Sequence, residues 1–552
     1  MNKGNNVLLI WPERDKAFYD FDPIGQIFGE KSLFFPLPLL YVAAALGKEW
    51  NYKLVDEGVS HLCDEDIDNA DFYLISVNVL QRYSAENTIQ RLIPHNKPII
   101  IGGPLISTLD HLFCHSRISK VYGEIEATEA SCLDSGLSIA ELLASDMRNG
   151  AIRNEYHSIG HPDIRQNKLP RYDLVKASGY FNLSMQTSRG CPHHCDFCQQ
   201  VALYGKHRRK THQQIIHELD LLLELGQNKT VYITDDNVMG DISTPDKKKE
   251  FIELLNSIRI WQERHDYPFD FFTQCSLDIA DYEDITELMS KIGLNIMFIG
   301  IESIDETALS SVHKQQNLQK DIIAKIRLLQ HYGIGIFAGM IIGFDNETNS
   351  SINHQIEFVK QSYIPIVGIS ILTGFPKTAL YHRLQKENRI CSDIDALTKS
   401  FQTNVITTMH PHDLYDNFLR FTKEIYNPHE YFVRCIAWTK TWNDAYVIPG
   451  KRGSLPENMR TQRILRSIFY QAIIAPYRFE YIKYFIKSLI CFANNYNKLA
   501  LALYLGYLFR IANDTTKKLE RFVQHLPQKI IDDWNQRFNP NALMASGNDP
   551  KL

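Results

Sequence analysis

The sequence predicts an α/β protein in which an N-terminal doubly wound parallel sheet and a partial (β/α)6 barrel are followed by a mainly helical C-terminal extension. A chain of 552 residues is too long for a single hydrophobic core. Short apolar runs separated by helix-like segments occur in two series, and such runs are typical of parallel sheets covered on both faces. The alternation stops after Leu380. We therefore expect a sheet domain over residues 1–137, a barrel over 180–390 and a helical domain over 391–538.

The first series contains five strand candidates and a crossover helix, which we predict over Leu37–Leu46. In doubly wound sheets a ligand binds beyond the carboxyl ends of the strands. No G-x-G-x-x-G follows the first strand, so we do not expect a dinucleotide. The strands are predicted at Val7–Trp11, Tyr52–Asp56, Phe72–Val79, Pro98–Gly103 and Ile118–Gly123.

The second series contains six strand–helix units, and this spacing indicates a barrel or partial barrel with parallel strands. Thr244-Pro245-Asp246 is a typical helix start, with a capping hydroxyl and a proline in the first turn. The strands are predicted at Leu183–Thr187, Val231–Thr234, Phe271–Gln274, Ile296–Ile301, Ile334–Ile342 and Ile366–Leu372. The helices are predicted at Gln213–Leu225, Lys247–Arg264, Ile285–Ile292, Asp321–His331, Asn349–Lys360 and Ala379–Lys386.

Two segments lack a strong periodic pattern. Residues 138–179 are charged, and we interpret them as a partly helical linker. Residues 539–552 contain Asn, Gly, Ser and Pro and are predicted to form a disordered tail.

The helical C-terminal region is interrupted by Pro411 and Pro428 and becomes basic toward its end. Eight basic and two acidic residues lie between Lys451 and Lys487, and the apolar run Leu499–Phe509 follows. One interpretation is a helical cap on the barrel with a solvated basic face. The other is a basic amphipathic surface that contacts a membrane, or a groove that receives a lipid. We do not expect nucleic acid as a partner, because the net charge is -5 and no nucleic-acid-reading module is recognisable.

The remaining features indicate a cytoplasmic protein, with peripheral contact with a membrane as the second option. The first residues lead directly into a strand rather than a signal peptide, and no uncharged apolar run reaches the ~18 residues of a membrane span. Seven cysteines are scattered without paired spacing, which suits a reducing compartment. They are Cys63, Cys114, Cys132, Cys275, Cys391, Cys435 and Cys491.

Three further cysteines lie within eight residues, in the order Cys191-x3-Cys195-x2-Cys198. Three thiolates can ligate three irons of a four-iron cluster and leave the fourth iron open. The alternatives are ordinary buried cysteines or a zinc site, for which His193 or His194 would supply the fourth ligand. The loop follows the first barrel strand, at the carboxyl end where such barrels carry their chemistry.

This loop, with Phe197 before its last cysteine, resembles the radical S-adenosylmethionine (SAM) superfamily. The order of the domains resembles the subclass that has an N-terminal cobalamin-binding domain. Several strand ends are most similar to the hopanoid C-methylase group. They are Tyr232–Asn237, Phe271–Gln274, Phe298–Ser303 and Gly339–Asp345.

The resemblance implies that the three loop cysteines hold a [4Fe-4S] cluster and that SAM chelates the open iron. Acidic, hydroxyl and glycine residues at the strand ends would contact SAM. For the acidic pair the alternative is capping of the next helix, and for the glycines it is packing. The implied SAM-binding residues are Phe197, Asp235, Asp236, Gln274, Glu302, Ser303, Gly339 and Gly343.

The resemblance also implies a cobalamin beyond the carboxyl ends of the first sheet. The D-x-H-x-x-G pattern of some cobalamin proteins is absent, because Gly58 stands at the histidine position. That histidine therefore cannot ligate the cobalt, and a solvent-facing role is expected for the nearby His61. The implied cobalamin-binding residues are Asp56, Gly58, Ser76, Asn78, Gly102, Gly103, Pro104 and Glu124.

The resemblance implies radical C-methylation of an sp3 carbon in an apolar or lipid-like, hopanoid-like substrate. A 5′-deoxyadenosyl radical would abstract hydrogen, and cobalamin would supply the methyl group. Catalytic residues other than the cluster and cofactors are not assigned. The expected partners are a small-molecule or lipid substrate and an electron donor such as flavodoxin or ferredoxin. One alternative keeps the radical chemistry without methyl transfer, as in ring closure or contraction, and another is a non-catalytic, metal-stabilised binding protein.

Overall fold

The computed structural model describes residues 4–14, 31–109, 111–226, 229–318, 321–391, 401–443, 465 and 468–538. The described chain divides into two compact units. The first contains the chain up to residue 192 together with residues 199–269, and the second contains residues 193–198 and the chain from residue 270 onward. The two units are described separately below, and the predicted tail at 539–552 lies outside the described residues.

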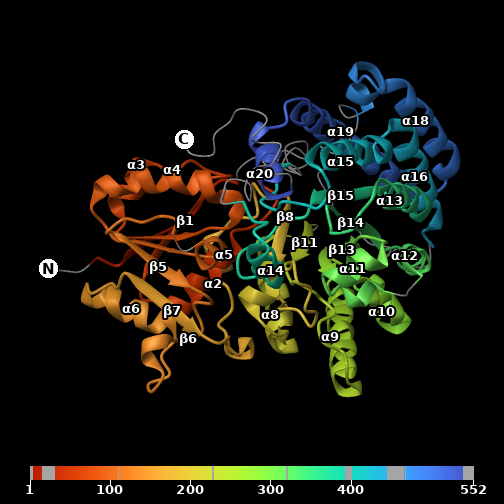
Figure 1. Cartoon of the computed structure of the whole chain (residues 1–552). Helices are drawn as coiled ribbons and strands as arrows, with labels where there is room; N and C mark the ends of the chain where they lie inside the picture. The colour runs from red at the N-terminus through yellow and green to blue at the C-terminus, as the bar shows by residue number, and fades with distance from the viewer. Residues whose placement is uncertain are drawn as a thin grey trace. The chain divides into compact units, whose positions relative to one another are not determined.

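The first unit is built around a seven-stranded sheet in the order β2-β1-β3-β4-β5-β7-β6 (Figure 1). All its pairings are parallel except that between β6 and β7. Neighbouring residues of β1 point to opposite faces, and Leu8 and Leu9 are both buried, so both faces are covered. This confirms the predicted doubly wound sheet. The strands are β1 (Asn6–Trp11), β2 (Asn51–Asp56), β3 (Phe72–Ser76), β4 (Ile99–Gly102), β5 (Ile118–Tyr122), β6 (Thr128–Glu129) and β7 (Glu155–Ile159).

Helices α2 and α6 pack together on one face of this sheet, where Leu39, Ala43, Ile139 and Leu143 join Leu9 in one hydrophobic core. The predicted helix Leu37–Leu46 is confirmed as α2, with the same bounds. The helices of the sheet region are α2 (Leu37–Leu46), α3 (Asp64–Asn69), α4 (Arg82–Leu92), α5 (Pro104–Thr108) and α6 (Ile139–Asn149).

The segment 138–179 differs from the expected linker, because its first part belongs to the sheet domain. Helix α6 begins with a capping box in which Ser138 and Glu141 exchange hydrogen bonds. Strand β7 then pairs with β5 and buries Tyr156. The sheet domain therefore extends to Ile159. The predicted boundary differs because the pairing of the short strand β7 with β5 is a tertiary contact.

The first unit continues through the start of the second series, where β11 pairs with β8 in parallel. Helix α9 begins as predicted, with the Thr244 hydroxyl accepting a hydrogen bond from the Lys247 N–H and Pro245 as the first helical residue. The elements are β8 (Asn182–Met185), β9 (Ser188–Arg189), α7 (Gln199–Tyr204), β10 (Arg208–Arg209), α8 (His212–Leu225), β11 (Lys229–Ile233) and α9 (Pro245–Arg264).

The second unit contains the other four strands of the series, which pair in parallel in the order β12-β13-β14-β15. With β8 and β11, all six predicted strands are present. The strands are β12 (Phe269–Cys275), β13 (Leu294–Glu302), β14 (Gly335–Ile342) and β15 (Ile366–Ile371). The helices between and after them are α10 (Glu283–Lys291), α11 (Glu306–Ser311), α12 (Ile322–His331), α13 (Asn349–Ser362) and α14 (Ala379–Lys386).

The C-terminal part of the second unit is helical, as predicted. Pro411 and Pro428 each occupy the first residue of a helix, where a proline costs no intrahelical hydrogen bond. A short π-helical turn at Tyr470–Ile474 precedes α18. In the part of the chain that the structure describes, no helix has both the length and the apolar character needed to cross a membrane. The helices are α15 (Pro411–Ile425), α16 (Pro428–Thr441), α18 (Arg478–Phe492), α19 (Tyr496–Gln524) and α20 (Gln528–Phe538).

Candidate active site

The three-cysteine loop follows β9, with Cys191 in the first unit and Cys195 and Cys198 in the second. None of the three cysteines forms a disulfide, and all three are partly exposed. Within the second unit the loop makes a tight turn, in which the Cys198 N–H donates to the Cys195 carbonyl oxygen at 3.0 Å. Two thiols are thus presented by one turn of backbone.

Asp196 anchors this turn to the surrounding protein. Its N–H donates to the Val312 carbonyl oxygen at 3.0 Å, and its own carbonyl oxygen accepts from the Leu380 N–H at 2.9 Å. Its carboxylate lies 2.8 Å from Nδ1 of His313. The turn from Cys195 to Cys198 is therefore held by contacts with the surrounding protein.

The donor set fits an iron–sulfur cluster. Free, accessible thiols are the ligands that such clusters take, and each cysteine binds a different iron of a four-iron cluster. Within the described residues, no group of three His, Cys, Asp or Glu side chains is arranged around one metal ion. Of the two histidines considered as zinc ligands, His193 has its Nε2 atom 3.1 Å from Ser276 Oγ, and His194 is exposed.

Two side chains that sequence reasoning missed lie against the loop. Lys314 is buried, donates to Glu302 Oε1 at 3.0 Å and lies 5.7 Å from the centre of the Phe197 ring. Burial disfavours its ammonium, but the charges of Glu302 and of the Cys195 and Cys198 thiolates outweigh burial and raise the pKa of Lys314. The loop therefore carries a fixed positive charge beside its thiols.

The second missed side chain, Gln316, donates from Nε2 to Cys195 Sγ at 3.4 Å. Hydrogen bonds to cluster sulfurs raise the reduction potential, because they stabilise the more negative, reduced state. No motif distinguishes this glutamine from its neighbours, so only the fold could reveal it.

Replacing Gln316 with Leu should lower the reduction potential of the bound cluster. The loss of one net hydrogen bond, about 1 kcal/mol, corresponds to on the order of 40 mV for one electron. An anaerobic redox titration followed by electron paramagnetic resonance measures this shift. Gln315→Leu is the matched control, because Gln315 is exposed one position away and its replacement should leave the potential unchanged. An unchanged potential in the Gln316 variant would show that this amide does not act on the cluster.

Two of the predicted SAM-binding residues, Glu302 at the end of β13 and Gly339 within β14, lie close together in the second unit. Glu302, the last residue of β13, has a left-handed backbone with φ of +65°. A Cβ atom at Gly339 would lie 3.0 Å from the Phe298 ring and 3.8 Å from Glu302 Oε2. A side chain at position 339 would therefore crowd the Phe298 ring and lie against the Glu302 carboxylate, which Lys314 links to the cysteine loop.

The other predicted residues of this set have local roles. Ser303 Oγ accepts from the Asp305 N–H at 3.1 Å in the turn after β13. Gly343 has φ of +96° and packs against Thr407 and Leu414, so turn geometry and packing account for it. Gln274 lies within β12, next to its last residue.

Asp235 and Asp236 lie in the first unit and both bind the segment that leads into the cysteine loop. Asp235 accepts from the Thr187 N–H at 2.7 Å and from the hydroxyl of Ser188 at 2.6 Å. Asp236 accepts from the Gly190 N–H at 2.9 Å, and burial raises the pKa of its carboxyl to about 7. These contacts differ from the capping alternative, since helix α9 is capped by Thr244.

Gly190 itself must be glycine. Its φ is +78°, and a Cβ atom would lie 2.6 Å from the carbonyl oxygens of Gly205 and Lys206. Position 190 thus brings the chain into close backbone contact directly before Cys191.

The predicted cobalamin-binding residues of β2, β3 and β4 lie at the carboxyl edge of the first sheet. At Gly103, which has φ of +101°, a Cβ atom would lie 2.7 Å from the Val77 carbonyl oxygen and 3.1 Å from Ser76 Oγ. At Gly102 the nearest contact of a Cβ atom would be 3.4 Å, to Val121. Turn geometry and the packing of the Val77 backbone thus account for Gly103, whereas Gly102 leaves room at this edge for the approach of a cofactor.

Two residues of this set are engaged in turns. Asp56 accepts from the Gly58 N–H at 2.9 Å and from the Tyr180 hydroxyl at 2.9 Å. Asn78 caps the turn after β3 by accepting from the Leu80 N–H at 2.9 Å. Pro104 is the first residue of α5, and His61 is exposed.

Glu124 is buried, and its carboxylate contacts three basic side chains of the protein. It accepts hydrogen bonds from Arg189 at 2.6 Å and from Arg208 at 2.8 Å, and it lies 2.9 Å from Nδ1 of His161. Arg189 directly precedes Gly190 and the cysteine loop. The ion network therefore ties the turn after β5 to the start of the loop, a link that sequence reasoning missed.

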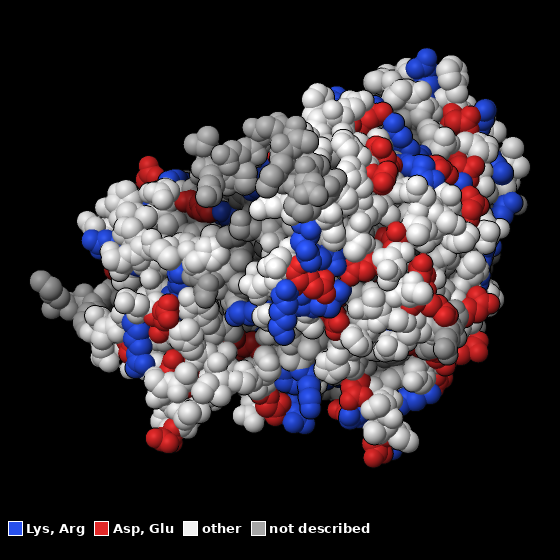
Figure 2. Space-filling model, in the orientation of Figure 1, with Lys and Arg blue, Asp and Glu red and all other residues white. Residues whose placement is uncertain are grey.

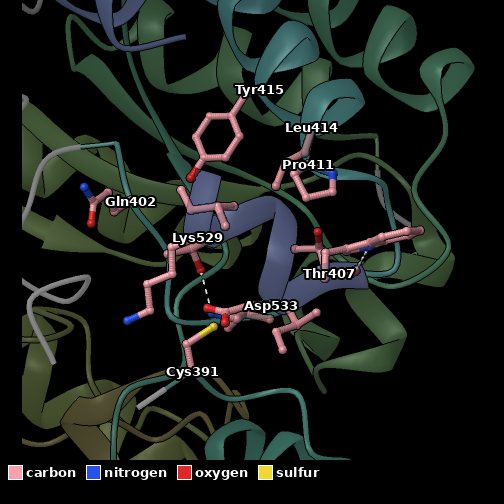
Figure 3. Close-up of a pocket in the computed structure, with 13 residues that line it drawn as sticks. Cys391, Gln402, Thr407, Pro411, Leu414, Tyr415, Lys529 and Asp533 are labelled. Atoms are coloured by element: carbon pink, nitrogen blue, oxygen red, sulfur yellow. Dashed lines mark hydrogen bonds between the residues drawn. The ribbon is translucent and has the colours of Figure 1, made fainter. Parts of the chain in front are cut away.

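A pocket in the second unit lies between the loop after Cys391, α15 and α20 (Figure 3). The Tyr415 hydroxyl in its wall is buried and has no hydrogen-bond partner among the described residues. The enclosed space is only about 40 Å³, which accommodates a few water molecules and no polycyclic lipid. We therefore do not place the substrate there.

A family model described as the radical SAM superfamily matches residues 185–359. A second model, described as a domain of unknown function (DUF4070), matches residues 378–521. An uncharacterized methyltransferase of Synechocystis sp. is 33% identical over 432 residues, which is 78% of this chain and 77% of that protein. The chain belongs to the radical SAM superfamily. Within it, the hopanoid C-2 methylase of Rhodopseudomonas palustris is 31% identical over 71% of this chain and 72% of that protein.

The solved structures support the fold of this radical SAM enzyme. The cobalamin-dependent SAM radical enzyme OxsB, with aqua-cobalamin and SAM bound, aligns over 97% of this chain and 84% of its own with a TM-score of 0.60 and 14% identity. The radical SAM methyltransferase TsrM of Kitasatospora setae, with cobalamin and a [4Fe-4S] cluster, aligns over 70% of this chain and 75% of its own with a TM-score of 0.51 and 15% identity. The predicted superfamily and fold class are thereby confirmed, and the non-catalytic alternative is set aside.

Proposed function

We propose that this radical SAM enzyme is a cobalamin-dependent C-methylase that acts on an sp3 carbon of an apolar, lipid-like substrate of the hopanoid class. The observation that carries the proposal is the similarity to hopanoid C-2 methylase, which extends over 71% of the chain and so includes more than the barrel. A doubly wound sheet ahead of a three-cysteine loop is the arrangement that such an enzyme needs, since one part holds the methyl carrier and the other generates the radical.

The cofactors of the proposal are a [4Fe-4S] cluster, SAM and cobalamin. Cys191, Cys195 and Cys198 hold the cluster. When bound, the cluster and SAM supply a radical that removes hydrogen from the substrate, and cobalamin carries the methyl group that replaces it. A flavodoxin or ferredoxin supplies the electrons.

The protein positions these groups. Glu302 offers SAM a carboxylate, Gly339 keeps the position beside it free of a side chain, and Lys314 fixes the Glu302 side chain by a 3.0 Å hydrogen bond. Asp235 and Asp236 act through the loop, since their carboxylates accept hydrogen bonds from residues 187–190. Phe197, Ser303, Gly343 and Gln274 complete the proposed SAM site.

The proposed cobalamin site lies at the carboxyl edge of β2, β3 and β4. Gly102 admits the cofactor, and Asp56, Gly58, Ser76, Asn78, Gly103 and Pro104 surround it along this edge. Glu124 is assigned to positioning, because its carboxylate is already occupied by two arginines. The sheet domain in this proposal includes β7 and therefore extends to Ile159.

Anaerobic reconstitution with iron, sulfide, cobalamin, SAM, a low-potential reductant and a hopanoid tests the proposal. We expect 5′-deoxyadenosine, S-adenosylhomocysteine and a hopanoid that is heavier by one methylene unit. Formation of 5′-deoxyadenosine without a methylated product or S-adenosylhomocysteine would favour the alternative of radical chemistry without methyl transfer. A lipid substrate also implies that the enzyme works in contact with a membrane surface.

A further inference from the structure

Helix α18 packs in the second unit through one face only. Its buried side chains are Tyr481, Tyr484, Ser488 and Phe492, which recur every three or four residues. The Tyr484 ring stacks on Phe432 of α16 at 4.6 Å, and its hydroxyl donates to the Ala502 carbonyl oxygen of α19 at 2.6 Å. Contacts with α16 and α19 thus fix which side of the helix faces the protein.

The opposite face of α18 is apolar and exposed to water. Its large side chains recur at the same helical spacing and form one stripe about 100° wide, where a surface helix normally carries polar residues. Ile490 is 77% exposed, more than any other large hydrophobic residue among those described. The stripe consists of Phe479 (66% exposed), Ile482 (36%), Ile486 (51%), Leu489 (39%) and Ile490.

The exposed apolar surface extends beyond α18 to the segment before it. Leu465, Phe469, Ile473 and Ile474 are each more than half exposed, and the π-helical turn that contains the last two contacts α18. Nine of the fifteen exposed large hydrophobic residues in the described chain lie between residues 465 and 490. Such clustering marks an interaction surface, whereas single exposed apolar residues are ordinary.

Basic side chains border the α18 stripe. At 100° per residue, Lys483 and Lys487 lie beside Ile490 on the helix surface, and both are exposed. Glu480 is the acidic residue of α18, and it lies 2.6 Å from Lys483 and 3.3 Å from His429. Figure 2 shows lysine and arginine side chains among uncharged residues along the upper right edge, where Figure 1 places α18.

We propose that this stripe, with the exposed side chains of Leu465, Phe469, Ile473 and Ile474, docks the enzyme on an anionic phospholipid bilayer. Aliphatic and aromatic side chains on one face with lysines beside them are typical of helices that lie in the interface plane. The lysine stems can cover apolar surface while their ammonium groups reach the lipid phosphates. The helix lies on the bilayer and does not span it, since it has 15 residues.

This inference deepens the proposed function, because a lipid-like substrate would be reached from the bilayer, but its test needs no turnover. The full-length, cluster-loaded enzyme is sedimented with vesicles of phosphatidylcholine alone, or of phosphatidylcholine and phosphatidylglycerol in equal amounts. We expect stronger binding to the mixed vesicles, weakened by salt because part of it is electrostatic.

Two sets of substitutions test the stripe. The double variant Ile486→Glu, Ile490→Glu should bind the mixed vesicles at least about tenfold more weakly, since two apolar side chains are lost from the contact. The double variant Lys483→Gln, Lys487→Gln should lose most of the preference for phosphatidylglycerol. Ile260→Glu is the matched control, because Ile260 is 39% exposed on another helix, α9, which does not belong to the stripe.

Equal vesicle binding by the wild type and the Ile486, Ile490 variant would overturn the proposal. A second result would also overturn it: the wild type is a dimer in sedimentation velocity, the variant is a monomer, and neither protein binds vesicles. The stripe would then join two copies of the chain. Cleavage of SAM in detergent solution should be the same in the variant and the wild type. Loss of docking is therefore distinguishable from failure of the methylase proposal.

Discussion

Replacing Cys195 with Ser should reduce the formation of 5′-deoxyadenosine to the level of a control without enzyme. Iron is held by thiolate, and a serine hydroxyl does not ionise at neutral pH in the same way, so one corner of the cluster is lost. Iron content after anaerobic reconstitution should fall from about four per chain to well under that value. The chain should still fold, since Asp196 anchors the loop through hydrogen bonds that do not involve the thiol.

The matched control for this prediction is Cys63→Ser. Cys63 is a free, exposed cysteine in the first unit, outside the loop. This variant should keep the iron content and the cleavage activity of the wild type. If the Cys195 variant retained both, the assignment of the loop as the cluster site would be wrong.

The fold could be predicted from the sequence wherever burial gives the apolar residues a clear pattern along the chain. Strands such as β1 and β3 are apolar and buried on both faces, and the start of α9 is marked by Thr244 and Pro245, so local signals and tertiary structure agree there. Strand β7 escaped prediction because it buries Tyr156 while its neighbours in the strand remain at least partly exposed. Its place in the sheet depends on pairing with β5, which no local pattern reveals.

The sequence predicted which types of residue lie at the candidate site, but it did not predict which residues they contact. A strand end predicts that Asp235 lies at the carboxyl edge, but its partners are Thr187 and Ser188, 47 to 48 positions earlier in the chain. Glu124 is predicted to bind cobalamin, and in the structure it accepts hydrogen bonds from Arg189 and Arg208, contacts that no local pattern indicates. Such pairings join residues distant in sequence, which composition and periodicity do not encode.

The C-terminal surface shows the same limit. Apolar and basic residues are interleaved in the sequence of α18. This pattern is expected both for a helical cap on the barrel and for a surface that contacts a membrane. Only the packing of Tyr484 and Phe492 against the protein decides which apolar residues remain exposed. Most of the basic stretch from Lys451 onward lies outside the described residues, so the inference rests on α18 and the residues directly before it.

Replacing Gly102 with Leu should remove cobalamin from the enzyme and abolish methyl transfer, while SAM cleavage continues. A Cβ atom at this position meets only Val121, at an ordinary 3.4 Å, so the sheet accommodates the change. The rest of the leucine side chain then occupies the carboxyl edge where the cofactor is proposed to lie. Overlap with a cofactor costs a few kcal/mol, which corresponds to at least about a tenfold loss of cobalt after reconstitution.

Position 102 is the better test of the cofactor than position 103. A side chain at Gly103 would collide with the Val77 backbone at 2.7 Å and damage the fold itself. Asn51→Leu is the matched control, because Asn51 is an exposed residue at the opposite, amino end of β2, and its variant should retain cobalt and methylate normally.

The outcomes separate two errors that the proposal could contain. A Gly102→Leu enzyme that keeps cobalt and methylates as the wild type does would show that cobalamin is not held at this edge. A wild-type enzyme that methylates without cobalt would instead contradict the role of cobalamin itself. The expected result is that the variant forms 5′-deoxyadenosine and no methylated product, because the cysteine loop and Glu302 are untouched by a change at the end of β4.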